Sequence, residues 1–335
     1  MLKVLVPVSF GAFIIWAFYD AMCQSQRDEL FAAFRKADYF WVIFSLVFGF
    51  ASHVSRAWRW RYLLEPLGHK PKFWTAYHSL MTGYLINYIF PRAGEPARAA
   101  VLTRKTGMSF DKVFGTIIAE RAIDLVMLGI VVGATLTLQL DNLDLFQEQI
   151  KSFQSNQSEC GSSDILTWLG RIVTWAFIAG FVGAVLLFAF SSKFRGKFIG
   201  LAKGVWEGLT TILRSKYKGQ FIFHTVFIWV MYIVFFGICF PAIEATSSIG
   251  IDGILAGFIA GTIGIILVQG GIGVYPAFVG LVLTTYLGDT TQLIHPEALA
   301  LGWLIWTSQT LMMIVLGLIS LIWAGQSEDF NGQPE

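Results

Sequence analysis

Charged residues are scarce in this chain, at 14% of 335 residues, whereas soluble proteins contain roughly a quarter. Hydrophobic residues make up 55% of the chain, and its mean hydropathy is +0.63. The formal net charge is only +2, so no large positive field is present that would indicate a nucleic-acid partner. This composition excludes an ordinary soluble domain and indicates an integral membrane protein.

Cysteine is also scarce, with three residues, no CxxC spacing and no neighbouring histidine cluster. No metal site and no cofactor are therefore expected. The sequence shows no Ser/His or Cys/His pattern of the kind that supports covalent catalysis. A transport or binding protein is thus favoured over an enzyme.

Long apolar runs are abundant instead. A bilayer core of about 30 Å needs roughly 20 helical residues, and six runs meet that length: 4–22, 40–58, 113–140, 165–190, 220–243 and 298–324. Two further runs end in glycine- and proline-rich breaks and are followed by shorter ones, giving the pairs 73–90 with 93–104 and 251–268 with 274–288. The sequence predicts a single all-α polytopic transmembrane domain over 1–325, and a disordered polar tail over 326–335.

Basic loops indicate how these runs are oriented, because short loops rich in Lys and Arg stay on the cytoplasmic side. The loop 191–219 and both flanks of 73–104 are basic and are expected inside, whereas the loop 141–164 is acidic and is expected outside. If 73–90 crossed the membrane, one basic flank would lie outside. A re-entrant hairpin over 73–104 removes the conflict, since irregular backbone is tolerated at membrane depth when protein or water covers it.

The segment 251–288 fits a second hairpin that enters from the opposite face. The chain then has two halves, about 1–140 and 165–325, each with the order helix, helix, hairpin, helix. Inverted repeats with paired broken helices indicate a transporter whose site lies near the membrane midplane. We therefore predict six full spans plus two re-entrant hairpins, with both termini cytoplasmic. A bundle of eight plain spans is the alternative.

The first break carries a charged motif, Asn87 followed by Pro91-Arg92-Ala93-Gly94-Glu95-Pro96 and Arg98. Amide groups at a helix start attract anions, and guanidinium groups match phosphate oxygens. Asn87 could contact the backbone of the break or a ligand, and Glu95 could pair with an arginine or take up a proton. The alternative is that these charges only hold the hairpin closed.

A second motif, Glu120, Arg121 and Asp124, lies in a spanning run. Its two acids are four residues apart and share one helix face. We expect Arg92 or Arg98 as their partner, either in a headgroup or proton-coupling site or in a structural salt bridge.

The second break reads Gln269-Gly270-Gly271-Ile272-Gly273. Three glycines in four residues permit left-handed backbone and a close approach of a ligand. Close packing of the backbone alone is the alternative.

A basic and aromatic group ends the second run. Arg and Trp at this depth are typical of anchoring at the headgroup interface, and a contact with a lipid phosphate is the less favoured interpretation. The group comprises His53, Arg56, Arg59 and Arg61 with Trp58 and Trp60.

These motifs resemble those of the lysylphosphatidylglycerol synthase/flippase family, in its transmembrane region, over about 40–320. The resemblance is carried by Arg59-Trp60, by Asn87 with Pro91, Arg92, Gly94, Glu95 and Arg98, by Glu120, Arg121 and Asp124, and by Gly270 to Gly273. Two departures concern the second break, where Gln269 replaces the usual proline and the acidic residue that normally follows is missing.

The resemblance implies a flippase-like transporter in the cytoplasmic (inner) membrane of a prokaryote. Its partner would be a membrane lipid with a phosphate headgroup, either an anionic phospholipid or a polyprenyl-phosphate-linked one. A homo-oligomer and a lipid-modifying enzyme partner are left open. The alternative is a membrane subunit or enzyme of lipid-linked glycan or aminoacyl-lipid metabolism, although the chain lacks the soluble acyltransferase domain of full-length synthases.

The residues predicted to line the substrate site are Asn87, Arg92, Glu95, Arg98, Glu120, Arg121, Asp124, Gln269, Gly270, Gly271 and Gly273.

Overall fold

The computed structural model describes residues 2–68, 70–90, 92–139, 216–288 and 294–325, with a few positions between 183 and 200. Every regular element in these ranges is a helix, which confirms the all-α class for the described part of the chain. The acidic loop 141–164, the tail 326–335 and nearly all of the expected span 165–190 lie outside the described residues.

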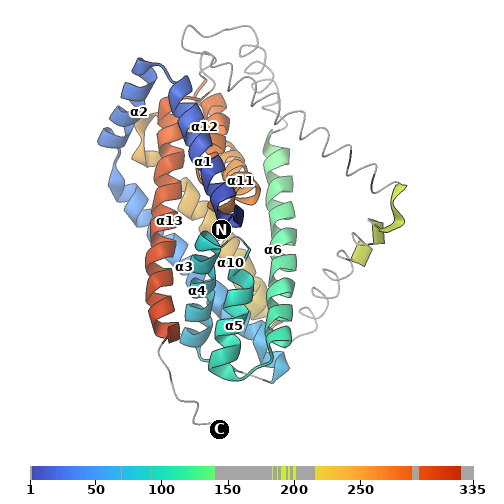
Figure 1. The fold of residues 1–335 in the computed structure, drawn as a ribbon. Coiled ribbons are helices and arrows are strands. Elements are labelled where there is room, and N and C mark those ends of the chain that lie inside the picture. The colour runs from blue at the N-terminus through green and yellow to red at the C-terminus, as the bar shows by residue number, and fades with distance from the viewer. Residues whose placement is uncertain are drawn as a thin grey trace.

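The helices follow the apolar runs predicted from the sequence (Figure 1). The α-helices are α1 (Leu2–Ala21), α2 (Gln24–Lys36), α3 (Tyr39–Leu64), α4 (Phe73–Ile89), α5 (Gly94–Thr106), α6 (Phe110–Gln139), α10 (Lys218–Gly237), α11 (Ile251–Leu267), α12 (Val274–Tyr286) and α13 (Pro296–Gly325). Short 3-10 turns lie between them, η1 (Glu65–Leu67), η3 (Phe240–Ala242), η4 (Glu244–Ser248) and η5 (Gln269–Gly271).

Three described helices are long and apolar enough to cross a membrane, namely Tyr39–Leu67, Lys218–Ala242 and Pro296–Gly325. They contain α3, α10 and α13, three of the six predicted spans. Helix α6 has the same length as α13, 30 residues, but charged residues interrupt its first half. The chain is thus a multi-pass membrane protein, with three clear candidate spans in the described ranges.

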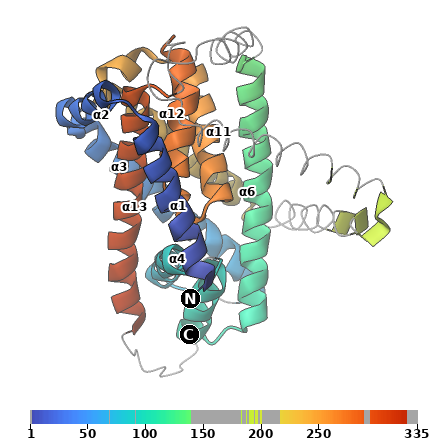
Figure 2. The same ribbon diagram turned by 45° about the horizontal axis from the view of Figure 1, so that its top comes forward.

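Two helical hairpins lie between the long helices. The first hairpin consists of α4 and α5, the second of α11 and α12; α4 and α11 have 17 residues each, α5 and α12 have 13 each. At 1.5 Å per residue these helices span about 25 Å and about 20 Å, less than the roughly 30 Å core of a bilayer. The first hairpin occupies the lower half of the bundle and the second the upper half (Figures 1 and 2).

The tip of the first hairpin forms where the sequence cannot continue a helix. Phe90 precedes a proline and is extended, with φ −120° and ψ 109°, because the proline ring excludes helical backbone at that position. Arg92 then has a left-handed φ of 63°. The two legs approach closely at Gly83 and Gly94, where a Cβ on Gly83 would lie 2.7 Å from the Gly94 carbonyl oxygen.

The tip of the second hairpin depends on its glycines. Gly270, Gly271 and Gly273 have φ values of 70°, 69° and 72°, a region that side chains with a Cβ rarely adopt. The predicted left-handed backbone is confirmed here.

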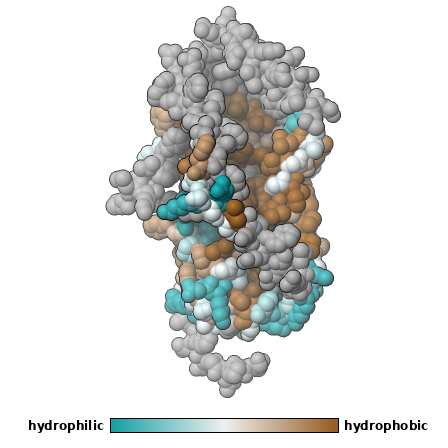
Figure 3. All heavy atoms as spheres, turned by 90° about the vertical axis from the view of Figure 1, so that its right-hand side faces the viewer, coloured by the Kyte–Doolittle hydropathy of each residue, from teal (hydrophilic) through white to brown (hydrophobic). Residues whose placement is uncertain are grey.

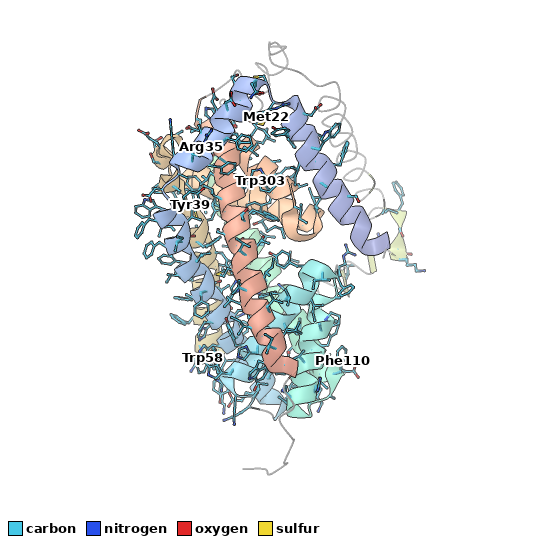
Figure 4. The ribbon with its side chains drawn as sticks, turned by 60° about the vertical axis from the view of Figure 1, so that its left-hand side comes forward. Met22, Arg35, Tyr39, Trp58, Phe110 and Trp303 are labelled. Atoms are coloured by element: carbon cyan, nitrogen blue, oxygen red, sulfur yellow. The ribbon has the colours of Figure 1, made fainter. Side chains whose placement is uncertain are left out.

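Both basic flanks of the first hairpin lie at the same end of the bundle. Arg61 Nε donates to the Pro71 carbonyl oxygen at 2.9 Å, and Lys105 Nζ lies 4.8 Å from the ring centroid of Trp323, near the end of α13. Figure 4 places Trp58 and Phe110 toward this end and Met22 at the opposite end. The two flanks predicted to share one side of the membrane therefore lie together, while most of the third basic segment, 191–219, lies outside the described residues.

Apolar side chains both fill the bundle and cover it. The largest buried cluster joins α2, α3, α10, α12 and α13, and hydrophobic residues cover much of the middle of the face in Figure 3, with hydrophilic residues gathered at its lower end. Helix α1 begins near mid-height in Figure 1 and packs on the second hairpin, where a Cβ on Gly11 would lie 2.9 Å from Ile272 Cγ2.

Candidate functional site

A buried charge cluster joins α3, α5 and α6. It comprises Arg56 and Arg59 of α3, Arg98 of α5, and Glu120 and Asp124 of α6. The three arginines are at most 3% exposed, and Glu120 is fully buried. Charged residues from the last part of α3, the start of α5 and the first half of α6 thus meet in the interior of the bundle.

Glu120 lies at the centre of this cluster. Its Oε1 accepts from Arg59 Nη2 at 2.9 Å and from Arg56 Nη1 at 3.3 Å, while Oε2 accepts from Arg98 Nη2 at 2.8 Å. Of the two partners expected from the sequence, Arg98 is therefore confirmed, whereas Arg92 forms no ion pair with either acid among the described residues.

Asp124 completes the arrangement one turn later. Its Oδ2 accepts from Arg56 Nη1 at 2.9 Å, and its Oδ1 lies 2.8 Å from Arg59 Nη1. Three guanidinium groups (+3) therefore face two carboxylates (−2), which leaves the cluster with one net positive charge. A buried charge without a counter-charge is costly in a membrane interior.

Arg98 has two buried nitrogens without a hydrogen-bond partner among the described residues, whereas Arg56 and Arg59 have one each, their Nε. The guanidinium carbon of Arg98 lies 3.6 Å from the ring centroid of Trp60, and Trp60 is fixed by an Nε1–H bond to Thr116 Oγ1 at 2.9 Å. Only Nη2 bonds to Glu120; Nε and Nη1 have no hydrogen-bond partner among the described residues. These two nitrogens carry three buried N–H donors without a partner.

A cavity of about 50 Å³ lies beside Arg98, between the two legs of the first hairpin and α6. It is lined by Leu80, Gly83, Tyr84, Asn87, Gly94, Glu95, Arg98 and Arg121. Since one water molecule needs roughly 10–15 Å³ by this kind of measure, the cavity accommodates a small polar group and not a whole lipid.

An ion pair lies on the more exposed side of this cavity. Arg121 Nη2 is 3.0 Å from Glu95 Oε1, and both side chains are about a third to two-fifths exposed. Farther in, Asn87 Oδ1 accepts from the Gly94 amide at 3.4 Å. Asn87 therefore caps the returning helix, one of the two contacts expected for it.

The structure brings together six of the predicted site residues, Asn87, Glu95, Arg98, Glu120, Arg121 and Asp124. It does not place Arg92 in the cavity lining; Arg92 is exposed at the hairpin tip.

The predicted glycines of the second break, Gly270, Gly271 and Gly273, do not line this cavity, and the side chain of the predicted Gln269 lies outside the described part of the structure. The Gly270 carbonyl accepts from Trp306 Nε1 at 2.6 Å, and a Cβ on Gly273 would lie 2.9 Å from the Gly11 carbonyl oxygen. The glycines therefore serve close packing in this structure. The two tips also meet, since a Cβ on Gly270 would lie 3.4 Å from the Tyr88 ring.

The interpretation of the second run as a purely interfacial anchor is wrong for Arg56 and Arg59, because both side chains are buried and paired with acids. For Arg61 it stays a prediction; the guanidinium carbon of this residue lies 4.5 Å from the centroid of the partly exposed Trp58 ring. Arg56 and Arg59 are three residues apart and therefore share one face of α3, and this face is buried in the structure.

A serine–histidine contact was also missed from the sequence. Ser55 Oγ and His224 Nδ1 are 2.7 Å apart, although the residues are far apart in the chain. Ser55 is only 3% exposed. Within the described ranges, no group of three or more His, Cys, Asp or Glu side chains is placed to hold a metal ion.

Comparison with protein families gives one match. The model described as "Lysylphosphatidylglycerol synthase TM region" matches residues 4–318. Searches of curated proteins and of solved structures found no match.

Proposed function

This chain belongs to the lysylphosphatidylglycerol synthase TM region family, and from that premise we propose that it is a lipid flippase-like transporter. The proposed ligand is the headgroup of an anionic phospholipid or of a polyprenyl-phosphate-linked lipid. Its phosphate binds in the cavity beside Arg98, while the acyl or prenyl chains stay in the membrane.

The observation that carries this proposal is the state of Arg98. The side chain is buried, lines a cavity that also contains Asn87, Glu95 and Arg121, and keeps three N–H donors without a hydrogen-bond partner among the described residues. The surrounding charge cluster has one positive charge in excess. An anion in the cavity would satisfy both the donors and the charge.

The remaining site residues have supporting roles in this proposal. Glu120 and Trp60 hold the Arg98 guanidinium in place, whereas Glu95 and Arg121 form the ion pair beside the ligand. Because Glu120 contacts three guanidinium groups, its role is to hold charge in place, and Glu95 is the better candidate for proton exchange.

Two matched halves support a transport mechanism. Both hairpins pair a 17-residue helix with a 13-residue helix, and each is followed by a 30-residue helix. The hairpins occupy opposite halves of the bundle (Figure 1). We propose that they are re-entrant and related as an inverted repeat, with the basic end of the bundle facing the cytoplasm of a prokaryote.

The proposal is tested with the purified chain in liposomes that contain fluorescent lipid analogues. We expect dithionite quenching to show flipping of phosphatidylglycerol at least several times faster than flipping of phosphatidylcholine. Only the phosphatidylglycerol headgroup has a net negative charge, which would balance the excess positive charge beside Arg98. Equal rates for both lipids, or rates equal to protein-free liposomes, would contradict the proposal.

The enzyme alternative is favoured by one observation, the short contact between Ser55 and His224. A nucleophilic serine needs access to its substrate, and Ser55 is 3% exposed. We therefore expect a fluorophosphonate probe to leave Ser55 unlabelled, as judged by mass spectrometry against a Ser55→Ala control. Stoichiometric labelling at Ser55 would favour an intramembrane hydrolase or transferase instead.

A further inference from the structure

The upper end of α6 bridges the open end of the second hairpin. Gln139, the last residue of α6, donates from Nε2 to the Asp252 carbonyl oxygen at 3.1 Å, and its Oε1 accepts from the Tyr286 hydroxyl at 2.5 Å. Asp252 is the second residue of α11, and Tyr286 is the last residue of α12. One buried amide thus ties together both legs of this hairpin; we call this contact the second-hairpin clasp.

The lower end of α13 bridges the open end of the first hairpin in the same manner. On α4, His78 Nδ1 lies 2.9 Å from Ser320 Oγ, and its ring stacks on Trp323 with centroids 4.6 Å apart. On α5, Lys105 Nζ lies 4.8 Å from the Trp323 centroid. Ser320 and Trp323 thus tie both legs together; we call this contact the first-hairpin clasp.

The two clasps are equivalent in position. Each is made by the last turns of a 30-residue helix, and each closes the hairpin of the other half. They lie at opposite ends of the bundle, since α11 and α12 occupy its upper half and α4 and α5 its lower half (Figures 1 and 2).

We propose that the two clasps are the gates of this carrier and open in turn, one at each membrane face. This inference rests on the proposed function. When one clasp opens, the hairpin behind it tilts away from the long helix, so that its legs become accessible from that face as far as the tip. The other clasp stays closed and keeps the membrane sealed.

The kinds of contact involved determine where the molecule opens. The second-hairpin clasp contains only neutral hydrogen bonds, and the first contains one neutral bond, an aromatic stack and a cation–π contact. Such contacts are individually weak. By contrast, breaking the buried charge cluster would leave uncompensated charges in the membrane interior. The clasps therefore open before the cluster does.

The test measures thiol accessibility at one buried reporter in each hairpin, Leu283→Cys near the second clasp and Ala76→Cys near the first. Both positions are fully buried. A membrane-impermeant maleimide is applied to the full chain in vesicles, and labelling above that of the chain without a reporter is recorded. Gln139→Leu removes both bonds of the second-hairpin clasp, whereas Ser320→Ala combined with Trp323→Leu opens the first.

We expect each clasp variant to raise labelling of its own reporter roughly fivefold to a hundredfold, the equilibrium shift for the loss of about two such contacts. The other reporter should not change. Thr135→Val and Ser308→Ala are the matched controls, because each removes a hydroxyl that donates to a carbonyl oxygen of its own helix. If Gln139→Leu reduces the yield of folded protein, Tyr286→Phe is the milder variant of the same clasp.

Labelling equal to the controls would overturn the inference, and so would a rise at both reporters in every clasp variant, which would indicate general loosening. Accessibility does not depend on lipid identity, so these outcomes are distinct from failure of the proposed function. If the clasps open in turn but the wild-type chain shows no headgroup preference, only the proposed substrate is wrong.

Discussion

Replacing Arg98 with alanine is expected to remove headgroup-dependent flipping while leaving the chain folded. The substitution deletes three unpartnered donors of a residue that lines the cavity. It also deletes the single excess positive charge, so that two arginines then face two acids. Loss of one charge-assisted hydrogen bond costs about 1.5–3 kcal/mol, which lowers phosphate affinity roughly tenfold to a hundredfold. Native mass spectrometry of co-purified lipid and the liposome assay measure the two effects.

Two further variants test the assignment, one that separates charge from geometry at Arg98 and one control at another arginine. Arg98→Lys keeps the charge but replaces the planar fork by a single ammonium group, so we expect partial binding. Arg61→Ala is the matched control, because that arginine lies at the bundle end beside Trp58. Unchanged lipid binding and flipping in Arg98→Ala would reject the assignment of the phosphate site.

The hairpins could be predicted from the sequence because their breaks are local. Pro91 excludes helical backbone at Phe90, and the glycine run of the second break adopts positive φ at three positions. Both signals are contained in a few consecutive residues, and the observed helix ends lie within a few residues of the predicted ones.

The partners of the charges could be predicted only in part. The spacing of Glu120 and Asp124 indicates a shared face, and Arg98 was one of two partners expected for them. Arg56 and Arg59 were missed because a basic, tryptophan-rich span end is also the usual pattern of an interfacial anchor. Only the packing of α3 against α6 and α10 distinguishes these two interpretations.

The clasps and the Ser55–His224 contact depend entirely on long-range packing. Gln139 meets Asp252 and Tyr286 across more than a hundred residues, and no local pattern around a lone glutamine predicts such a partner. The polar residues of these contacts join helices whose relative positions are determined by the packing of the whole bundle.

Replacing Glu120 with glutamine is expected to lower stability more than any other single change in the site. The carboxylate pairs with three buried guanidinium groups, and without it three arginines would face Asp124 alone. Removal of one partner from a buried charge network costs about 3–5 kcal/mol, a large part of the 5–15 kcal/mol that typically stabilises a folded protein. We expect a clear fall in Tm and in the yield of monodisperse protein in detergent.

A matched variant and a rescue variant show whether this loss arises from charge. Asp111→Asn removes an acid from the exposed first turn of the same helix and should leave Tm nearly unchanged. Adding Arg98→Ala to Glu120→Gln removes one of the uncompensated cations, so the double variant should recover part of the lost stability. Equal Tm values for Glu120→Gln and Asp111→Asn would mean that the cluster does not stabilise the fold. The excess positive charge beside the cavity could then no longer be attributed to a fixed network around Glu120.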